Sequence, residues 1–269
     1  ILIVLALVLS VHFADAQTKS PAEAKKAVEA ADAAAQNPKK ATKVATWLKL
    51  ATAYMDAYEA PAGNVLVNSP RVQVQMMIGN ERPSSSENVV IDGINFKKEV
   101  YSNKNLYFDD MDYLRIIEVT KPIYADPLAS ALEAYVKAYE VDAKKTKEKD
   151  IKDGIAKIAQ KYFEDGMNQY SIGDMAKSGE LLAKAAEASA TAPYSKIDST
   201  SLYNAGYVYW AAQDYKTAQK YFEQCRSIGY YYEGGEVFAK LGDIYMNLDD
   251  AAKGVATLEE GFVKYPQSQ

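Results

Sequence analysis

SLYNAGYVYWAAQDYKTAQKYFEQCRS, residues 201–227, is the stretch that decides the fold. Small and aromatic residues recur at helical spacing on either side of a turn at Gln213-Asp214-Tyr215. We call these recurring positions slots. They are Leu202, Ala205, Gly206 and Tyr209 before the turn, and Ala218, Phe222 and Cys225 after it. A small residue on one helix lets a second, antiparallel helix approach closely, while large residues fill the space beside the contact. We therefore expect a tight pair of antiparallel helices.

The same pattern recurs on both sides of this stretch. Gly242 follows Gly206 by 36 residues, in a copy made of Phe238, Leu241, Gly242, Tyr245, Gly254, Leu258, Gly261 and Pro266. An upstream copy has Tyr162, Asp165, Gly166 and Gln169, then a turn at Gly173-Asp174, then Ser178, Leu182 and Ala185. Asp165 and Gln169 depart from the apolar and aromatic pattern, so this copy is the weaker one. Gly166 precedes Gly206 by 40 residues, and a recurrence at about this spacing is typical of a helical repeat protein.

These copies resemble the tetratricopeptide repeat (TPR) of exported bacterial envelope proteins, whose period is about 34 residues. The resemblance covers about residues 20–58 and 126–266. It implies a mainly α fold, a TPR-like α-solenoid of antiparallel helix pairs with a small antiparallel β insertion. A further helix from Pro21 to about Gln36 is expected to cap the array, because proline is favoured in the first turn of a helix.

The first repeat is split in the sequence. Its first helix is expected within about residues 40–58, around Trp47, Leu50, Ala51 and Tyr54, and its second helix at residues 131–142. We interpret residues 60–124 as a β-rich insertion between these two helices, inside a TPR-like domain of residues 17–269. A loop of this length inside a repeat is uncommon without a role.

Within the insertion, the apolar period changes from helical to alternating. Val72, Val74, Met76 and Ile78 alternate with other residues and predict one strand. The segment Asn80 to Asn88 is expected to be a surface loop, and Asp92-Gly93 predicts a two-residue hairpin turn. Strands are then expected at residues 89–91, 94–101, 106–108 and 113–119, which together make an antiparallel meander.

Residues 1–16 have the pattern of a secretory signal peptide. The apolar run ILIVLALVLSV is followed by Ala14-Asp15-Ala16, a small-x-small cleavage signal, and the run is too short to span a bilayer. We expect cleavage after Ala16 and a periplasmic or exported product without a transmembrane span. A buried N-terminal strand or helix is the alternative.

Composition argues against several classes of function. The formal net charge is −5 and the pI is near 5.2, which is unfavourable for a nucleic-acid binder. His12 is the only histidine and lies in the expected signal peptide, so serine triads and HExxH zinc sites are not expected. The turn Asp109, Asp110, Asp112 lacks the register of an EF-hand, and Cys225 occupies a packing slot. We therefore predict no enzyme activity, catalytic residue, cofactor or metal site.

The candidate binding residues form an aromatic stripe. Tyr203, Tyr207 and Trp210 fall at i, i+4 and i+7 of one expected helix, which places them on one face. Phe163, Met167 and Tyr170 occupy matching slots one repeat earlier, and Asn204 matches one residue of the carboxylate clamp of some TPR proteins. In such arrays this stripe lines the concave surface. The alternative is that several of these rings pack between helices or under the insertion.

The resemblance implies a non-enzymatic periplasmic scaffold or adaptor. It would bind a protein or peptide partner, such as an envelope complex, on the concave surface, on the β insertion, or on both. A glycan-binding module of a nutrient-uptake system is the alternative function, because exposed aromatic rings also stack on sugars. The insertion could bind the partner itself, or fold back and fill the groove.

Overall fold

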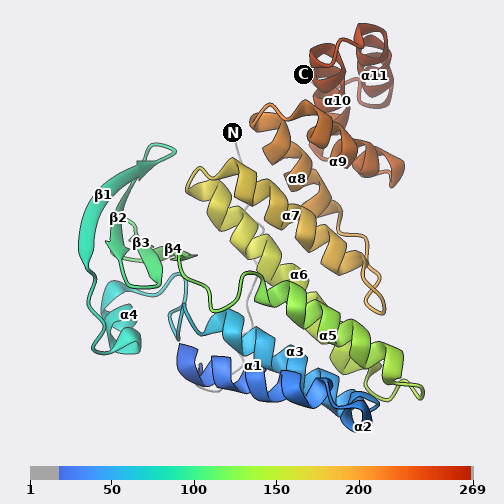
Figure 1. Cartoon of the computed structure of the whole chain (residues 1–269). Helices are drawn as coiled ribbons and strands as arrows, with labels where there is room; N and C mark the ends of the chain where they lie inside the picture. Colours follow the sequence, from blue (N-terminus) through green and yellow to red (C-terminus); the bar gives the residue numbers. More distant parts are fainter. Residues whose placement is uncertain (1–17, 268–269) are drawn as a thin grey trace.

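The computed structural model describes residues 18–267, as an array of helices with a small β-sheet at its side (Figure 1). The helices of the array are α1 Pro21–Ala35, α2 Pro38–Ala41, α3 Val44–Glu59, α5 Pro127–Val141, α6 Glu148–Ser171, α7 Met175–Ala190, α8 Ser199–Ala211, α9 Tyr215–Ser227, α10 Glu236–Asn247 and α11 Ala251–Lys264. A 3-10 turn, η1 Glu233–Gly235, precedes α10. The predicted fold class, a TPR-like solenoid with a small antiparallel sheet, is confirmed. The expected signal peptide lies outside the described residues.

The helices pack in sequential pairs, α6 with α7, α8 with α9 and α10 with α11, while α3 pairs with α5 across the insertion. Aspartates start the second helices. The carboxylates of Asp174, Asp214 and Asp250 accept hydrogen bonds from the first-turn backbone N–H groups of α7, α9 and α11. Such capping satisfies N–H groups that have no partner within the helix. Helix α1 begins with a Ser20–Glu23 capping box and packs on α3.

Glycines on the first helices allow the close approach that the sequence predicts. A methyl group added at Gly242 would lie 2.5 Å from Leu258, and one at Gly166 would lie 2.8 Å from Leu182. At Gly206 the added methyl would lie 3.3 Å from Phe222. Glycine at these positions therefore lets the two helices of each pair pack closely. A large side chain of the second helix lies over the backbone of the first.

The insertion contains one helix and four strands: α4 Arg71–Ile78, β1 Ser85–Ile91, β2 Ile94–Val100, β3 Lys104–Phe108 and β4 Leu114–Val119. The strands form an antiparallel meander in the order β1-β2-β3-β4, as predicted. Asp92 and Gly93 both have positive φ, 51° and 77°, and connect β1 to β2. A two-residue hairpin with positive φ at both positions matches the right-handed twist of the strands.

Two predictions within the insertion are wrong. Residues 72–78 form helix α4 rather than a strand, because Val74, Met77 and Ile78 share one helical face that packs against the sheet. Val72 and Met76 lie on the opposite face and are exposed. The expected loop at Asn80 to Asn88 is also too long, because residues 85–88 pair with residues 97–100 as the first half of β1.

The sheet lies between two apolar clusters. One face packs on α4 through Leu106, Phe108 and Leu114. On the other face, Phe96, Tyr107 and Ile116 pack with Ile172, which follows the last residue of α6. The sheet is thus attached to the array at the turn between α6 and α7. Over residues 18–267, no helix combines the length and apolar character needed to cross a bilayer.

Candidate functional site

Four of the seven predicted binding residues lie together. Met167 and Tyr170 of α6 and Asn204 and Tyr207 of α8 line a small surface depression with Val208, here called the aromatic depression. The phenols of Tyr170 and Tyr207 lie near each other, and burial is the main cause that raises the pKa of Tyr170. The depression forms because α6 and α8 are the first helices of successive pairs, so their matching slots meet.

Trp210 extends this surface toward α10. Its ring centroid lies 5.8 Å from that of Tyr207, and its indole N–H donates to the Asp243 carboxylate at 2.6 Å. The Lys240 ammonium lies 3.4 Å from the Trp210 ring centroid and 5.2 Å from that of Tyr207. A cation over an aromatic face is an attractive arrangement. Helix α10 therefore adds a polar pair at one end of the aromatic surface.

The sequence prediction missed Lys240 and Asp243, although a signal for them existed. The spacing of 36 residues between Gly206 and Gly242 assigns Lys240 to the slot of Asn204, and Asp243 to the slot of Tyr207. Continuing the stripe by one repeat would have included both. The predicted stripe stops at Trp210 because Lys240 and Asp243 are charged and do not continue its mainly aromatic pattern.

The structure places Tyr203 in the core, outside the lining of the aromatic depression. The side chain is only 5% exposed, and its ring stacks on Tyr232 with centroids 4.2 Å apart. Phe222 approaches it edge-on at 5.7 Å. Burial and the nearby Glu236 raise the pKa of the Tyr203 phenol above its usual range. The expected stripe is therefore interrupted at this position, because the linker before α10 covers it.

Phe163 is half-buried and lies outside the lining of the aromatic depression. Its ring packs against two clusters, one around Leu128 and Ile158 and the other around Leu182 and Ala205. It therefore supports the joint between successive helix pairs. The predicted set separates into a surface group and two residues with packing roles, Phe163 and Tyr203.

The β1–β2 hairpin lies at the rim of the aromatic depression. The charge of Asp92 contributes to raising the pKa of Tyr170, after burial and Tyr207. Near it, Ile172 packs with Val89 and Ile91 of β1. The insertion thus reaches the edge of the surface, while Met167, Tyr170, Tyr207 and Trp210 all keep part of their area exposed.

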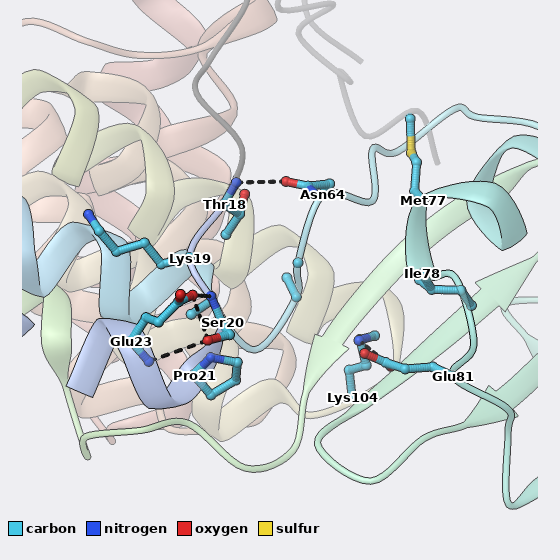
Figure 2. A pocket seen from close by; sticks show the side chains of 13 residues that line it. Thr18, Lys19, Ser20, Pro21, Glu23, Asn64, Met77, Ile78, Glu81 and Lys104 are labelled. Carbon is cyan, nitrogen blue, oxygen red and sulfur yellow. Dashed lines mark hydrogen bonds and ion pairs between the residues drawn. The ribbon is translucent and has the colours of Figure 1, made fainter. Parts of the chain in front are cut away.

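A second hollow, of about 730 Å³, lies between the start of α1 and the insertion (Figure 2). Lys104 of β3 lines it and is only 2% exposed, with its ammonium 2.9 Å from the Glu81 carboxylate and 3.4 Å from the Pro61 carbonyl oxygen. Asn64 accepts a hydrogen bond from the Thr18 backbone N–H across the hollow. Because Lys104 is already paired with Glu81 and Pro61, its charge stabilises the insertion itself.

The acidic turn of the insertion is occupied by internal contacts. Asp109 accepts from the backbone N–H groups of Met111 and Tyr113 and pairs with Arg115 at 2.6 Å, while Asp112 pairs with Arg71 at 2.9 Å. Within residues 18–267 no group of three or more potential metal ligands occurs. These carboxylates therefore act as turn and ion-pair residues.

Cys225 is fully buried, and burial raises the pKa of its thiol to about 12. A thiol must ionise and be accessible to react. We expect a thiol-reactive probe to leave the native protein unlabelled and to label one thiol per chain in denaturant. Rapid labelling under native conditions would contradict the packing of α9 against α10.

The chain has weak similarity to known proteins. No protein-family model matches it, and no curated protein matches it either. Eight chains of solved structures match this chain. Among them, the MamA protein has 15% identity and a TM-score of 0.34, with 51% of this chain and 82% of that one covered. BtubC from P. vanneervenii has 16% identity and a TM-score of 0.32, with 90% and 88% covered, and the APC/C hetero-tetramer Cut9-Hcn1 has 15% and 0.30, with 90% and 36% covered. This chain thus spans about a third of the length of the Cut9-Hcn1 chain that it matches. The TPR-like description of the fold rests on the helix pairs themselves.

Proposed function

We propose that this chain is a non-enzymatic scaffold that binds an extended peptide segment of a protein partner across α6, α8 and α10. The observation that carries the proposal is the aromatic depression, where four residues chosen from the sequence alone meet on α6 and α8, the first helices of two successive pairs. Half-exposed rings with polar tips suit peptide recognition, because they offer apolar area together with a hydrogen-bonding group. An envelope location belongs to the proposal and is supported by the signal-like pattern of residues 1–16.

The chemistry of the surface favours a peptide rich in aromatic or proline residues. Met167 offers apolar contact, and the phenols of Tyr170 and Tyr207 offer hydrogen bonds at the rim. At the other end, Lys240 is paired with Glu236 at 3.4 Å, and Asp243 holds Trp210. The charged groups therefore fix the ring of Trp210 in place, and a bound side chain would contact a rigid surface.

The double variant Tyr207→Ala with Trp210→Ala tests the proposal. Partners are first identified by crosslinking in intact source cells, and binding of the purified partner is then measured by calorimetry. Loss of two central rings should weaken binding by about 30-fold or more, since each central contact of this kind is worth up to a few kcal/mol. Tyr113→Ala, a half-exposed tyrosine of the insertion, is the matched control. A partner that binds the double variant at wild-type strength would exclude this surface.

The glycan alternative has a direct test. Lys240 lies over the Trp210 ring, so a stacking sugar would have to displace the ammonium or use the other side of the ring. In a Trp47→Phe background, only Trp210 reports by fluorescence. We expect a panel of oligosaccharides to give a flat response, and a saturable change would favour the glycan module.

A further inference from the structure

The outer face of α11, the last helix of the array, is apolar and exposed. Val255, Leu258, Phe262 and Val263 have exposed fractions of 47%, 40%, 68% and 78%, and Ala251, Ala252 and Ala256 are exposed beside them. Two other charged side chains of the helix contact α9 of the preceding repeat, since Lys253 lies 3.8 Å from Glu223 and Glu260 pairs with Arg226. Lys264 pairs with Glu260 within α11, at 2.9 Å. Glu259 is the charge that remains on the outer face.

The opposite end of the array is different. Helix α1 covers α3 with its apolar face and presents Lys25, Lys26 and Glu29 to solvent. Terminal units of repeat proteins need such a polar outer face to remain soluble. The N-terminal end therefore has a cap, whereas Figure 1 shows α11 at the outside of the array, beyond α10.

The preceding repeat shows what normally covers this face. Phe222 of α9 occupies the slot of Leu258 one repeat earlier, and both Phe222 and Cys225 of α9 are fully buried. They are buried because Val237, Leu241 and Ile244 of α10 pack on them. The α11 face is thus a helix-packing surface of the same kind, and no helix within residues 18–267 covers it.

We propose that α11 of a second copy of this chain covers this face, and that the two helices pair antiparallel about a two-fold axis. Ala251, Val255, Leu258 and Phe262 are spaced by four, three and four residues, which is the seam of a coiled coil. In the antiparallel register Ala251 faces Phe262 of the partner subunit, and Val255 faces Leu258 of the partner subunit. In both of these contacts a smaller side chain packs against a larger one.

The charges are compatible with this register. Glu259 flanks the seam and lies opposite the partner's Ala252, so the two glutamates do not meet. Stacking of α11 on the α1 of the next copy would instead place Val255 and Phe262 against Lys25 and Lys26, which are strongly hydrated. A two-fold pairing also closes on itself, whereas end-to-end stacking would continue into a filament.

The test is the mass in solution, measured by sedimentation velocity and light scattering over a range of concentrations. Wild-type protein should approach twice the 29.6 kDa of one chain as its concentration rises, and the variant Val255→Glu with Phe262→Glu should remain monomeric. Val72→Glu with Met76→Glu, two exposed apolar residues on one face of α4, is the matched control and should dimerise as the wild type does. Circular dichroism verifies that each variant is folded.

A disulfide test reports the register. A mixture of Ala252→Cys and Glu259→Cys chains should crosslink mainly as the mixed pair, since these positions face each other in the antiparallel arrangement. Cys225 is fully buried and does not interfere. Wild-type protein that stays monomeric to about 100 μM, where an interface of a single helix pair still associates, would overturn the proposal and leave the face to another polypeptide. A dimer that survives the α11 variant, or that crosslinks mainly through like positions, would overturn it too.

Discussion

Replacement of Tyr203 by alanine should lower the free energy of unfolding by about 3–5 kcal/mol, the usual range for removing a large buried ring. Tyr203 is 5% exposed, and its ring contacts Tyr232 and Phe222, so the truncation would leave a cavity where α8, α9 and the linker before α10 meet. The measurement is equilibrium denaturation in urea, followed by circular dichroism. Helices α10 and α11 depend on this joint and should lose stability with it.

Tyr207→Ala is the matched comparison, one turn further along the same helix. Tyr207 is half-exposed and lines the aromatic depression, so its truncation should cost much less stability and should act on partner binding instead. Tyr203→Phe keeps the ring and removes only the phenolic hydroxyl near Glu236, a change of about 1 kcal/mol. Equal destabilisation by Tyr203→Ala and Tyr207→Ala would show that the two rings do not have the different roles assigned to them.

These two tyrosines show where prediction from sequence stops. Helical spacing places Tyr203, Tyr207 and Trp210 on one side of α8, and that much is correct. Which ring is buried depends on the linker that carries Tyr232, whose path is not part of the repeat pattern. A periodic sequence therefore predicts the surface on which a residue lies, but it does not predict what irregular segment covers that surface.

The repeated part of the fold was predictable because each level of the sequence agrees with the others. Small residues at Gly206 and Gly242, aspartate caps at the turns and a nearly constant period all specify the same helix pairs. In the insertion, residues 72–78 are too few to distinguish the two periods, because Val74 and Ile78 are compatible with one face of a strand and with one face of a helix. Packing of α4 on the sheet decides between them.

Asp165→Asn should stabilise the protein by about 2–3 kcal/mol at pH 8 and change little at pH 4. Asp165 is the residue that departs from the repeat pattern on α6, and the structure gives the reason, since the Tyr58 hydroxyl of α3 donates to its carboxylate at 3.0 Å. Burial raises the pKa of Asp165 to about 6 from an ordinary value of 3.8. The contact joins the first and second helix pairs, but it leaves a buried charge above pH 6.

The direction in which stability changes with pH follows from the raised pKa of Asp165. Between pH 3.8 and 6 the folded protein keeps a proton on Asp165 that the unfolded chain has released, so the stability contributed by this group is full below pH 3.8 and falls as the pH rises through 6. A shift of about two units corresponds to about 3 kcal/mol. Asparagine keeps the acceptor for Tyr58 and cannot ionise, so the variant should lack this pH-dependent loss.

Urea denaturation of wild type and Asp165→Asn at pH 4, 6 and 8 measures the difference. The advantage of the variant should grow from near zero to its full value across this range. Tyr58→Phe is the complementary variant, because it removes the donor and leaves the carboxylate buried. Tyr58→Phe should therefore destabilise the protein more at pH 8 than at pH 4, because a hydrogen bond to an ionised carboxylate is stronger than one to a protonated carboxyl group. A pH-independent difference between wild type and Asp165→Asn would mean that Asp165 ionises in the folded protein as it does in water, and that the joint between α3 and α6 is open to solvent.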